Sequence, residues 1–185
     1  MLKPRTLASA ALAAALAAGL GGAASAHGAI HRAAHHKMVR KRTSSPFLKV
    51  LAAKKTVVFT ILAGDGTNNG GLDFDNTSGG TLVLTVPVNW TVDVVFKNVG
   101  GLPHSVLFDT WSTPLSDFSP KPAFPGAQSP QPIEGTPPGG HANFHFKATK
   151  VGKYRMVCAF PGHAVSGMWD TFIVSETAKA PSLKG

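Results

Sequence analysis

Proline and glycine break this chain into short segments, which restricts the folds that it can adopt. Residues 110–140 carry eight of its fourteen prolines. Proline donates no hydrogen bond to a sheet ladder, so we expect this stretch to be a long loop and not a central strand. The run 64–71 is rich in glycine and asparagine, which is typical of a turn that follows a strand.

Apolar and β-branched runs lie between these breaks. Residues 91–97 largely alternate between apolar and polar side chains, as expected of a strand with one buried and one solvated face. The predicted strands cover residues 56–63, 81–86, 91–97, 141–148, 153–158 and 169–174. We therefore predict an all-β fold, a Greek-key β-sandwich of about 7–8 strands with a Pro-rich loop insertion.

The N-terminal residues 1–26 are predicted to be a secretory signal peptide. A charged start, an apolar alanine-rich run and the small-residue site Ala24-Ser25-Ala26 support cleavage before His27. Because the uncharged stretch is close to the length that a bilayer requires, an uncleaved membrane anchor is the alternative. We expect the protein to be exported to the periplasm or another extracytoplasmic space.

Charge divides the rest of the chain into two parts. Residues 27–55 hold eight basic and no acidic residues, whereas residues 56–185 hold eight basic and nine acidic residues. We interpret 27–55 as a basic, His-rich linker and 56–185 as one domain. The linker could contact an anionic membrane surface or an acidic protein, while nucleic acid is not an expected partner of an exported chain. Its four histidines, from His27 to His36, could capture metal weakly.

The strongest chemical signal is the spacing of Cys158, His163 and Met168, which are five residues apart on one predicted loop. A thiolate, an imidazole and a thioether together suit copper, and a second histidine would complete the ligand set of a blue-copper electron-transfer site. His104, in the turn-to-strand run Leu102-Pro103-His104-Ser105, is that second histidine. The set of four predicts one type 1 copper ion, with zinc occupancy or an empty pocket as the alternatives.

The cysteine count agrees with this interpretation. Cys158 is the single cysteine of the chain, and exported proteins that use cysteine for stability carry it in pairs. A lone cysteine also excludes a binuclear copper centre and Cys-rich zinc or iron–sulfur sites. Met156 is predicted to lie in the core, and His141 and His145 are predicted to face solvent, so none of these joins the ligand set.

The sequence resembles the cupredoxins, and among them the sulfocyanin and rusticyanin type. The resemblance covers roughly residues 54–175 and rests on the spacing CxxxxHxxxxM, on LPHS at 102–105 and on FPGHAVSGMWD at 160–170. Ser105 looks more like rusticyanin, because sulfocyanin-type proteins tend to have Asn after the upstream ligand. The resemblance implies that electrons pass at the edge of His163, through an apolar patch formed by Gly101, Leu102, Pro161 and Val165.

The predicted function is therefore one-electron transfer between redox partners, and not catalysis. Expected partners are redox proteins, such as a cytochrome, a copper enzyme or an oxidase, that dock at the apolar patch; the protein itself is expected to be a monomer. Copper sequestration or delivery is the main alternative, because the histidine tract could collect metal. An enzyme is a third possibility, but catalysis needs an open coordination position or a second metal.

Overall fold

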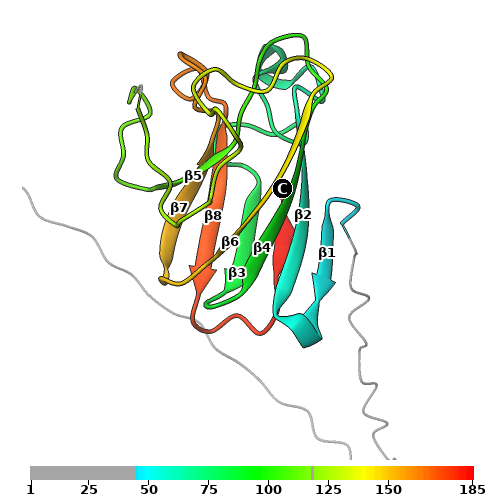
Figure 1. Ribbon diagram of the computed structural model, residues 1–185, viewed down its shortest axis with the longest axis vertical. Coiled ribbons are helices and arrows are strands. Elements are labelled where there is room, and N and C mark those ends of the chain that lie inside the picture. Colours follow the sequence, from blue (N-terminus) through cyan, green and yellow to red (C-terminus); the bar gives the residue numbers. More distant parts are fainter. Residues whose placement is uncertain (1–44, 118) are drawn as a thin grey trace, which may run out of the picture. The chain divides into compact units, whose positions relative to one another are not determined.

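The computed structural model describes residues 45–117 and 119–185, which form nine strands and two short 3-10 helices (Figure 1). The signal peptide predicted for 1–26 and most of the predicted linker therefore lie outside the described residues. The strands are β1 (Leu48–Leu51), β2 (Thr56–Ala63), β3 (Val83–Pro87), β4 (Thr91–Asn98), β5 (Leu107–Thr110), β6 (His141–Lys147), β7 (Gly152–Val157), β8 (Trp169–Ser175) and β9 (Ser182–Lys184). The helices are η1 (Ala52–Lys54) and η2 (Asn68–Gly71).

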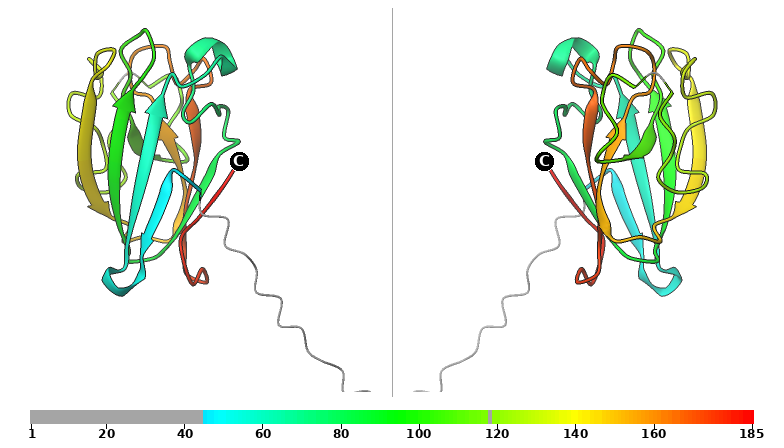
Figure 2. Two further views of the ribbon diagram at one scale, coloured as in Figure 1. Left: turned by 90° about the vertical axis from the view of Figure 1, so that its right-hand side faces the viewer. Right: turned by 90° about the vertical axis from the view of Figure 1, so that its left-hand side faces the viewer.

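The strands form two sheets that pack face to face (Figure 2). One sheet has the order β1-β2-β4-β6 and the other has the order β5-β7-β8-β3-β9. Both sheets are mixed, since β2 pairs with β4 and β3 pairs with β8 in parallel, while the other neighbours are antiparallel. The prediction of an all-β sandwich is confirmed, with nine strands in the described residues in place of seven or eight.

Aromatic side chains fill the space between the sheets. Phe146 of β6 lies with its ring centroid 4.7 Å from that of Phe108 of β5 and 5.9 Å from that of Phe172 of β8. All three are buried, and such offset or edge-to-face pairs add to the gain from burying apolar area. These contacts pack β6 of one sheet against β5 and β8 of the other.

The predicted strands agree closely with those observed, and β2 has the predicted bounds. Three short edge strands, β1, β5 and β9, are absent from the six predicted ranges, although a strand was expected to follow the turn at His104. Strand β1 pairs with β2, so the sheet begins N-terminal to the boundary predicted between residues 55 and 56. We had assigned this region to the linker because of its basic charge. Its side chains nevertheless alternate as in an edge strand, since Lys49 is exposed while Leu48 and Val50 are partly buried. Strand β9 pairs with β3 and is only three residues long.

The Pro-rich segment is a long loop, as predicted, with no strand in its described residues between 111 and 140. It nevertheless contributes to the core. Phe124 is buried and stacks on Phe146, with ring centroids 5.5 Å apart. Met156 is also buried, whereas His141 and His145 are exposed, as predicted. None of the helices in the described part of the chain is long and apolar enough to span a membrane.

Candidate metal centre

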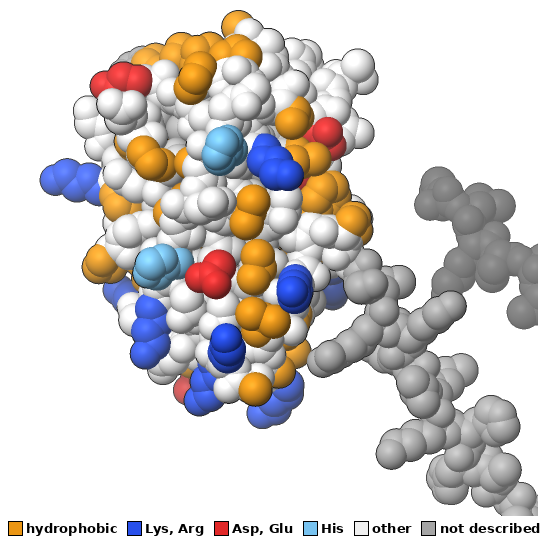
Figure 3. Space-filling view, turned by 45° about the vertical axis from the view of Figure 1, so that its right-hand side comes forward, with side chains coloured by type: hydrophobic (Ala, Val, Ile, Leu, Met, Phe, Trp, Pro, Cys, Tyr) orange, Lys and Arg blue, Asp and Glu red, His pale blue; other side chains and the backbone are white. Residues whose placement is uncertain are grey.

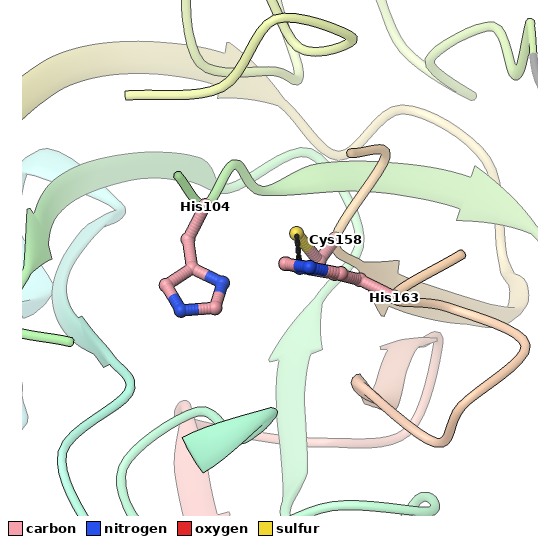
Figure 4. Close-up of side chains that lie close together, drawn as sticks. All are labelled: His104, Cys158 and His163. Atoms are coloured by element: carbon pink, nitrogen blue, oxygen red, sulfur yellow. Dashed lines mark hydrogen bonds between the residues drawn. The ribbon is translucent and has the colours of Figure 1, made fainter. Parts of the chain in front are cut away.

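Three potential metal ligands meet at one end of the sandwich. One donor atom from each of His104, Cys158 and His163 lies within 4.8 Å of the other two. Figure 4 shows the three side chains close together, with a contact of 3.5 Å between Cys158 Sγ and His163 Nδ1. His104 comes from the segment before β5 and Cys158 follows directly after β7. The pairing of β5 with β7 explains how residues 54 positions apart come together.

Backbone hydrogen bonds place Met168 next to Cys158 and His163. Its N–H donates to the carbonyl of His163 at 3.0 Å, and its carbonyl accepts from the N–H of Cys158 at 3.1 Å. The side chain is fully buried, and Met168 directly precedes β8. The loop from Cys158 to Met168, hereafter the ligand loop, therefore closes on itself at the end where β7 and β8 pair.

Ser105 connects the two halves of the site. Its N–H donates to Cys158 Sγ at 3.3 Å, and its Oγ accepts from the N–H of Ala159 at 3.0 Å. A backbone N–H that points at sulfur stabilises negative charge on that atom. The residue after the upstream histidine is thus a hydrogen-bond partner of the cysteine, a role that the sequence did not reveal.

Burial sets the protonation of all three groups. It lowers the pKa of His104 to about 4, with a further contribution from neighbouring His163, and it also lowers the pKa of His163. Burial raises the pKa of the Cys158 thiol, against the opposing effect of the N–H from Ser105. Neutral imidazoles have a lone pair free for a metal, whereas the thiol must lose its proton when a metal binds.

The segment that carries His104 is held by backbone and amide hydrogen bonds. His104 exchanges two backbone hydrogen bonds with Thr136, at 3.1 and 2.7 Å. Buried Asn98 donates through its side-chain amide to the carbonyls of Leu102 and Thr136, and its Oδ1 accepts from the N–H of Gly100. These bonds fix the turn on which His104 lies.

One atom of the site indicates that a ligand belongs there. His104 Nδ1 is buried and has no hydrogen-bond partner among the described residues. A buried polar atom without a partner is costly, and a metal ion would satisfy it. The donor set of one thiol, one thioether and two imidazoles fits copper in both oxidation states.

The surface beside His163 is apolar. His163 is 7% exposed, while Leu102 and Val165 nearby in the fold are 51% and 60% exposed. Gly101 and Pro161 are exposed as well. Hydrophobic side chains gather at the upper end of the domain in Figure 3, which is the end of the ligand loop in Figure 1. The patch predicted from the resemblance is therefore solvent-accessible.

Comparison with known proteins identifies the family. The model of the Sulfocyanin (SoxE) domain matches residues 43–183. The sulfocyanin of Sulfolobus acidocaldarius is 33% identical over 138 residues, which are 70% of this chain and 69% of that protein. The chain belongs to the sulfocyanin family. The predicted resemblance to sulfocyanin-type cupredoxins is thus confirmed, and the family together with the buried donors confirms copper as the cofactor.

Solved structures of rusticyanin show the same fold. A rusticyanin variant matches with a TM-score of 0.52 and 26% identity, over 65% of this chain and 78% of that chain. Rusticyanin from Thiobacillus ferrooxidans matches with a TM-score of 0.51 and 24% identity, over 70% of this chain and 88% of that chain. This sulfocyanin-family protein therefore has the cupredoxin fold of rusticyanin.

All four predicted ligand residues lie in this region of the sulfocyanin fold, but the sequence did not reveal what supports them. Asn98 and Thr136 were not singled out, because a single asparagine or threonine near a glycine looks like any turn residue. Asn69, which contacts the ligand loop, lies in the run 64–71 that was predicted only as a turn. No local sequence signal distinguishes these residues from others of their type.

Proposed function

We propose that this protein is a one-electron carrier that binds one copper ion through His104, Cys158, His163 and Met168. The observation that supports this most strongly is the meeting of two buried imidazoles and a buried thiol beside Met168, with His104 Nδ1 lacking a partner among the described residues. When bound, copper supplies reversible one-electron chemistry between its two oxidation states.

The residues of the site each have a separate task in this proposal. His104 and His163 offer neutral nitrogen donors, because burial disfavours their protonation. Cys158 binds as a thiolate and so gives up its proton on metal uptake, helped by the N–H of Ser105. Backbone hydrogen bonds hold the donors in place, so they need little rearrangement when the charge of the site changes.

Replacing Met168 by Leu is expected to raise the reduction potential while the intense blue colour remains. Leu keeps the apolar volume but removes the thioether, which helps to stabilise the oxidised metal more than the reduced one. Spectroelectrochemical titration of both proteins would measure the change. A fall in potential in the variant would contradict the assignment of Met168 as a ligand.

Electrons are proposed to pass at the apolar patch of Gly101, Leu102, Pro161 and Val165. Residues 56–185 have a net charge of −1, from eight basic and nine acidic residues. Such a domain gains little from long-range steering, so a redox protein partner would dock through apolar contact. We propose that the carrier works outside the cytoplasm, as the predicted signal peptide implies.

Introducing a positive charge into this patch tests whether electrons pass there. In Val165→Lys, two copies that dock patch to patch would place two ammonium groups close together, so electron self-exchange should slow about fivefold at low salt. Line broadening in NMR spectra of mixed oxidised and reduced protein measures this rate. The visible spectrum should not change.

Val151→Lys is the matched control for this variant. Val151 is 48% exposed and directly precedes β7, whereas Cys158 directly follows that strand. The same charge at the opposite end of β7 should leave self-exchange unaltered. Equal slowing in both variants, or no slowing in Val165→Lys, would argue against transfer at the patch.

The burial of the donors favours a carrier over copper delivery. Cys158 and His104 are almost inaccessible, and a delivery protein needs a site from which a partner can withdraw the metal. Catalysis would likewise need an open coordination position for substrate. We therefore propose electron transfer, and no enzymatic reaction, as the function of this site.

A further inference from the structure

Asn69 of η2 connects a distant loop to the ligand loop. Its side-chain amide donates to the carbonyl of Ser166 at 2.8 Å, across a separation of 97 residues. The same amide donates to the carbonyl of Leu72 at 2.9 Å. The side-chain NH2 group of Asn69 therefore donates two hydrogen bonds, one to a nearby residue of its own segment and one to the ligand loop.

The backbone at this position suits asparagine. Asn69 has a φ of 49°, in the left-handed region, which asparagine adopts more readily than most residues. Gly70 follows with a φ of 67°. The side chain of Asn69 also lies close to the backbone of Gly167, where a β-carbon would be only 3.0 Å from Asn69 Nδ2. Gly167, with a φ of 99°, leaves room for the amide.

Ser166, which accepts the hydrogen bond from Asn69, lies in the sequence between the proposed ligands His163 and Met168. Within the ligand loop, the N–H groups of Ser166, Gly167 and Met168 donate to carbonyls of the same loop, at 3.0 to 3.1 Å. These bonds curl the loop but tie it only to itself. Two hydrogen bonds connect the stretch between His163 and Met168 to other parts of the domain: the side-chain bond from Asn69 to Ser166, and the bond from the N–H of Gly79 to the carbonyl of Gly167 at 2.9 Å.

We propose that Asn69 is a positioning residue for the metal centre. Its amide holds the Ser166 carbonyl and so adds to the backbone hydrogen bonds that set how closely Met168 approaches the site. This inference rests on the proposed function, in which Met168 is a ligand. It assigns to the loop of residues 64–71 a role in setting the reduction potential, although that loop supplies none of the proposed ligands.

The test uses Asn69→Gly, because glycine keeps the left-handed backbone and removes only the amide side chain. Asn68→Ala is the matched control. Asn68 is also exposed and also donates twice, but to the carbonyl of Asn76 and the Oγ of Ser78 and not to the ligand loop. Met168→Leu provides the potential expected when the thioether is lost completely.

Two measurements are needed, one without metal and one with copper. In the metal-free protein, the amides of Gly167 and Met168 should exchange hydrogen about tenfold faster in Asn69→Gly, as expected for the loss of the hydrogen bond between Asn69 and the ligand loop. In the copper-loaded protein, the reduction potential of Asn69→Gly should move toward that of Met168→Leu. Asn68→Ala should match the wild type in both measurements.

The outcomes separate this inference from the proposed function. An unchanged potential in Asn69→Gly, with or without faster exchange, would overturn the positioning role. Equal changes in Asn68→Ala would overturn it too, because they would reflect a general loosening of the loop. A wild-type protein without a thiolate-to-copper absorption band would instead overturn the proposed function, whereas exchange in the metal-free protein would still report on the Asn69 contact.

Discussion

Replacing Cys158 by Ser is expected to weaken the binding of copper(I) by more than about a hundredfold. Loss of a residue that only supports a ligand typically costs ten- to a hundredfold in metal affinity, and loss of a direct ligand should cost more. Serine has nearly the same shape but offers a hard oxygen in place of the soft thiolate that copper(I) prefers. Competition with a chromophoric copper(I) chelator would measure the affinities of both proteins.

The control for this variant is the stability of the metal-free fold. Cys158 is buried in the core, and its Sγ accepts a hydrogen bond from the N–H of Ser105. The hydroxyl of a serine at this position can accept the same hydrogen bond. Thermal unfolding of the two metal-free proteins should therefore show that the variant remains folded. An affinity within about threefold of the wild type in a folded variant would show that Cys158 is not a ligand.

The second large effect concerns pH. Burial raises the pKa of Asp75 from 3.8 to about 7, opposed by the N–H of Leu62, which donates to its Oδ1 at 2.8 Å. Negative charge on Asp65, Asp170 and Asp73 raises this pKa further. Asp75 Oδ2 is buried without a hydrogen-bond partner in the described part of the chain. The folded state thus favours the protonated carboxyl.

The sign of the effect follows from the raised pKa of the folded state. The contribution of Asp75 to stability is fully present below pH 3.8 and is lost as the pH rises through about 7. Between pH 5 and pH 8 the free energy of unfolding should fall by about 2 to 3 kcal/mol through this group. Chemical denaturation of the copper-free protein at both pH values would measure the change.

Asp75→Asn isolates this contribution from those of other groups. His104 and His163 have lowered pKa values, so they act in the opposite direction and destabilise the metal-free protein as the pH falls. Asparagine resembles the protonated carboxyl and tolerates the φ of 51° at this position. The variant should gain stability over the wild type at pH 8 but not at pH 5. A difference that is independent of pH would contradict the raised pKa of Asp75.

Local patterns in the sequence predicted the strands and the candidate ligands. Strand β2 was predicted with its observed bounds because a β-branched run ends there in turn residues. Cys158, His163 and Met168 could be recognised because their chemistry and their spacing lie within one loop. His104 is distant in sequence, and only the pairing of β5 with β7 explains its place in the site.

What could not be predicted depends on contacts between distant segments. Strands β1 and β9 are short and lie beside β2 and β3, so their existence depends on pairing more than on their own pattern. The bonds of Asn98 and Asn69 depend on which loops meet at the end of the sandwich. Such tertiary hydrogen bonds leave no periodic signal in the chain.

The most direct test of the central claim is spectroscopy of the copper(II)-loaded protein. The visible and electron paramagnetic resonance spectra should show an intense blue thiolate-to-copper band and a narrow hyperfine splitting. Both features should be absent from Cys158→Ser. A colourless protein, or a spectrum that does not change when Cys158 is replaced, would contradict the account of this site as a blue-copper electron-transfer centre.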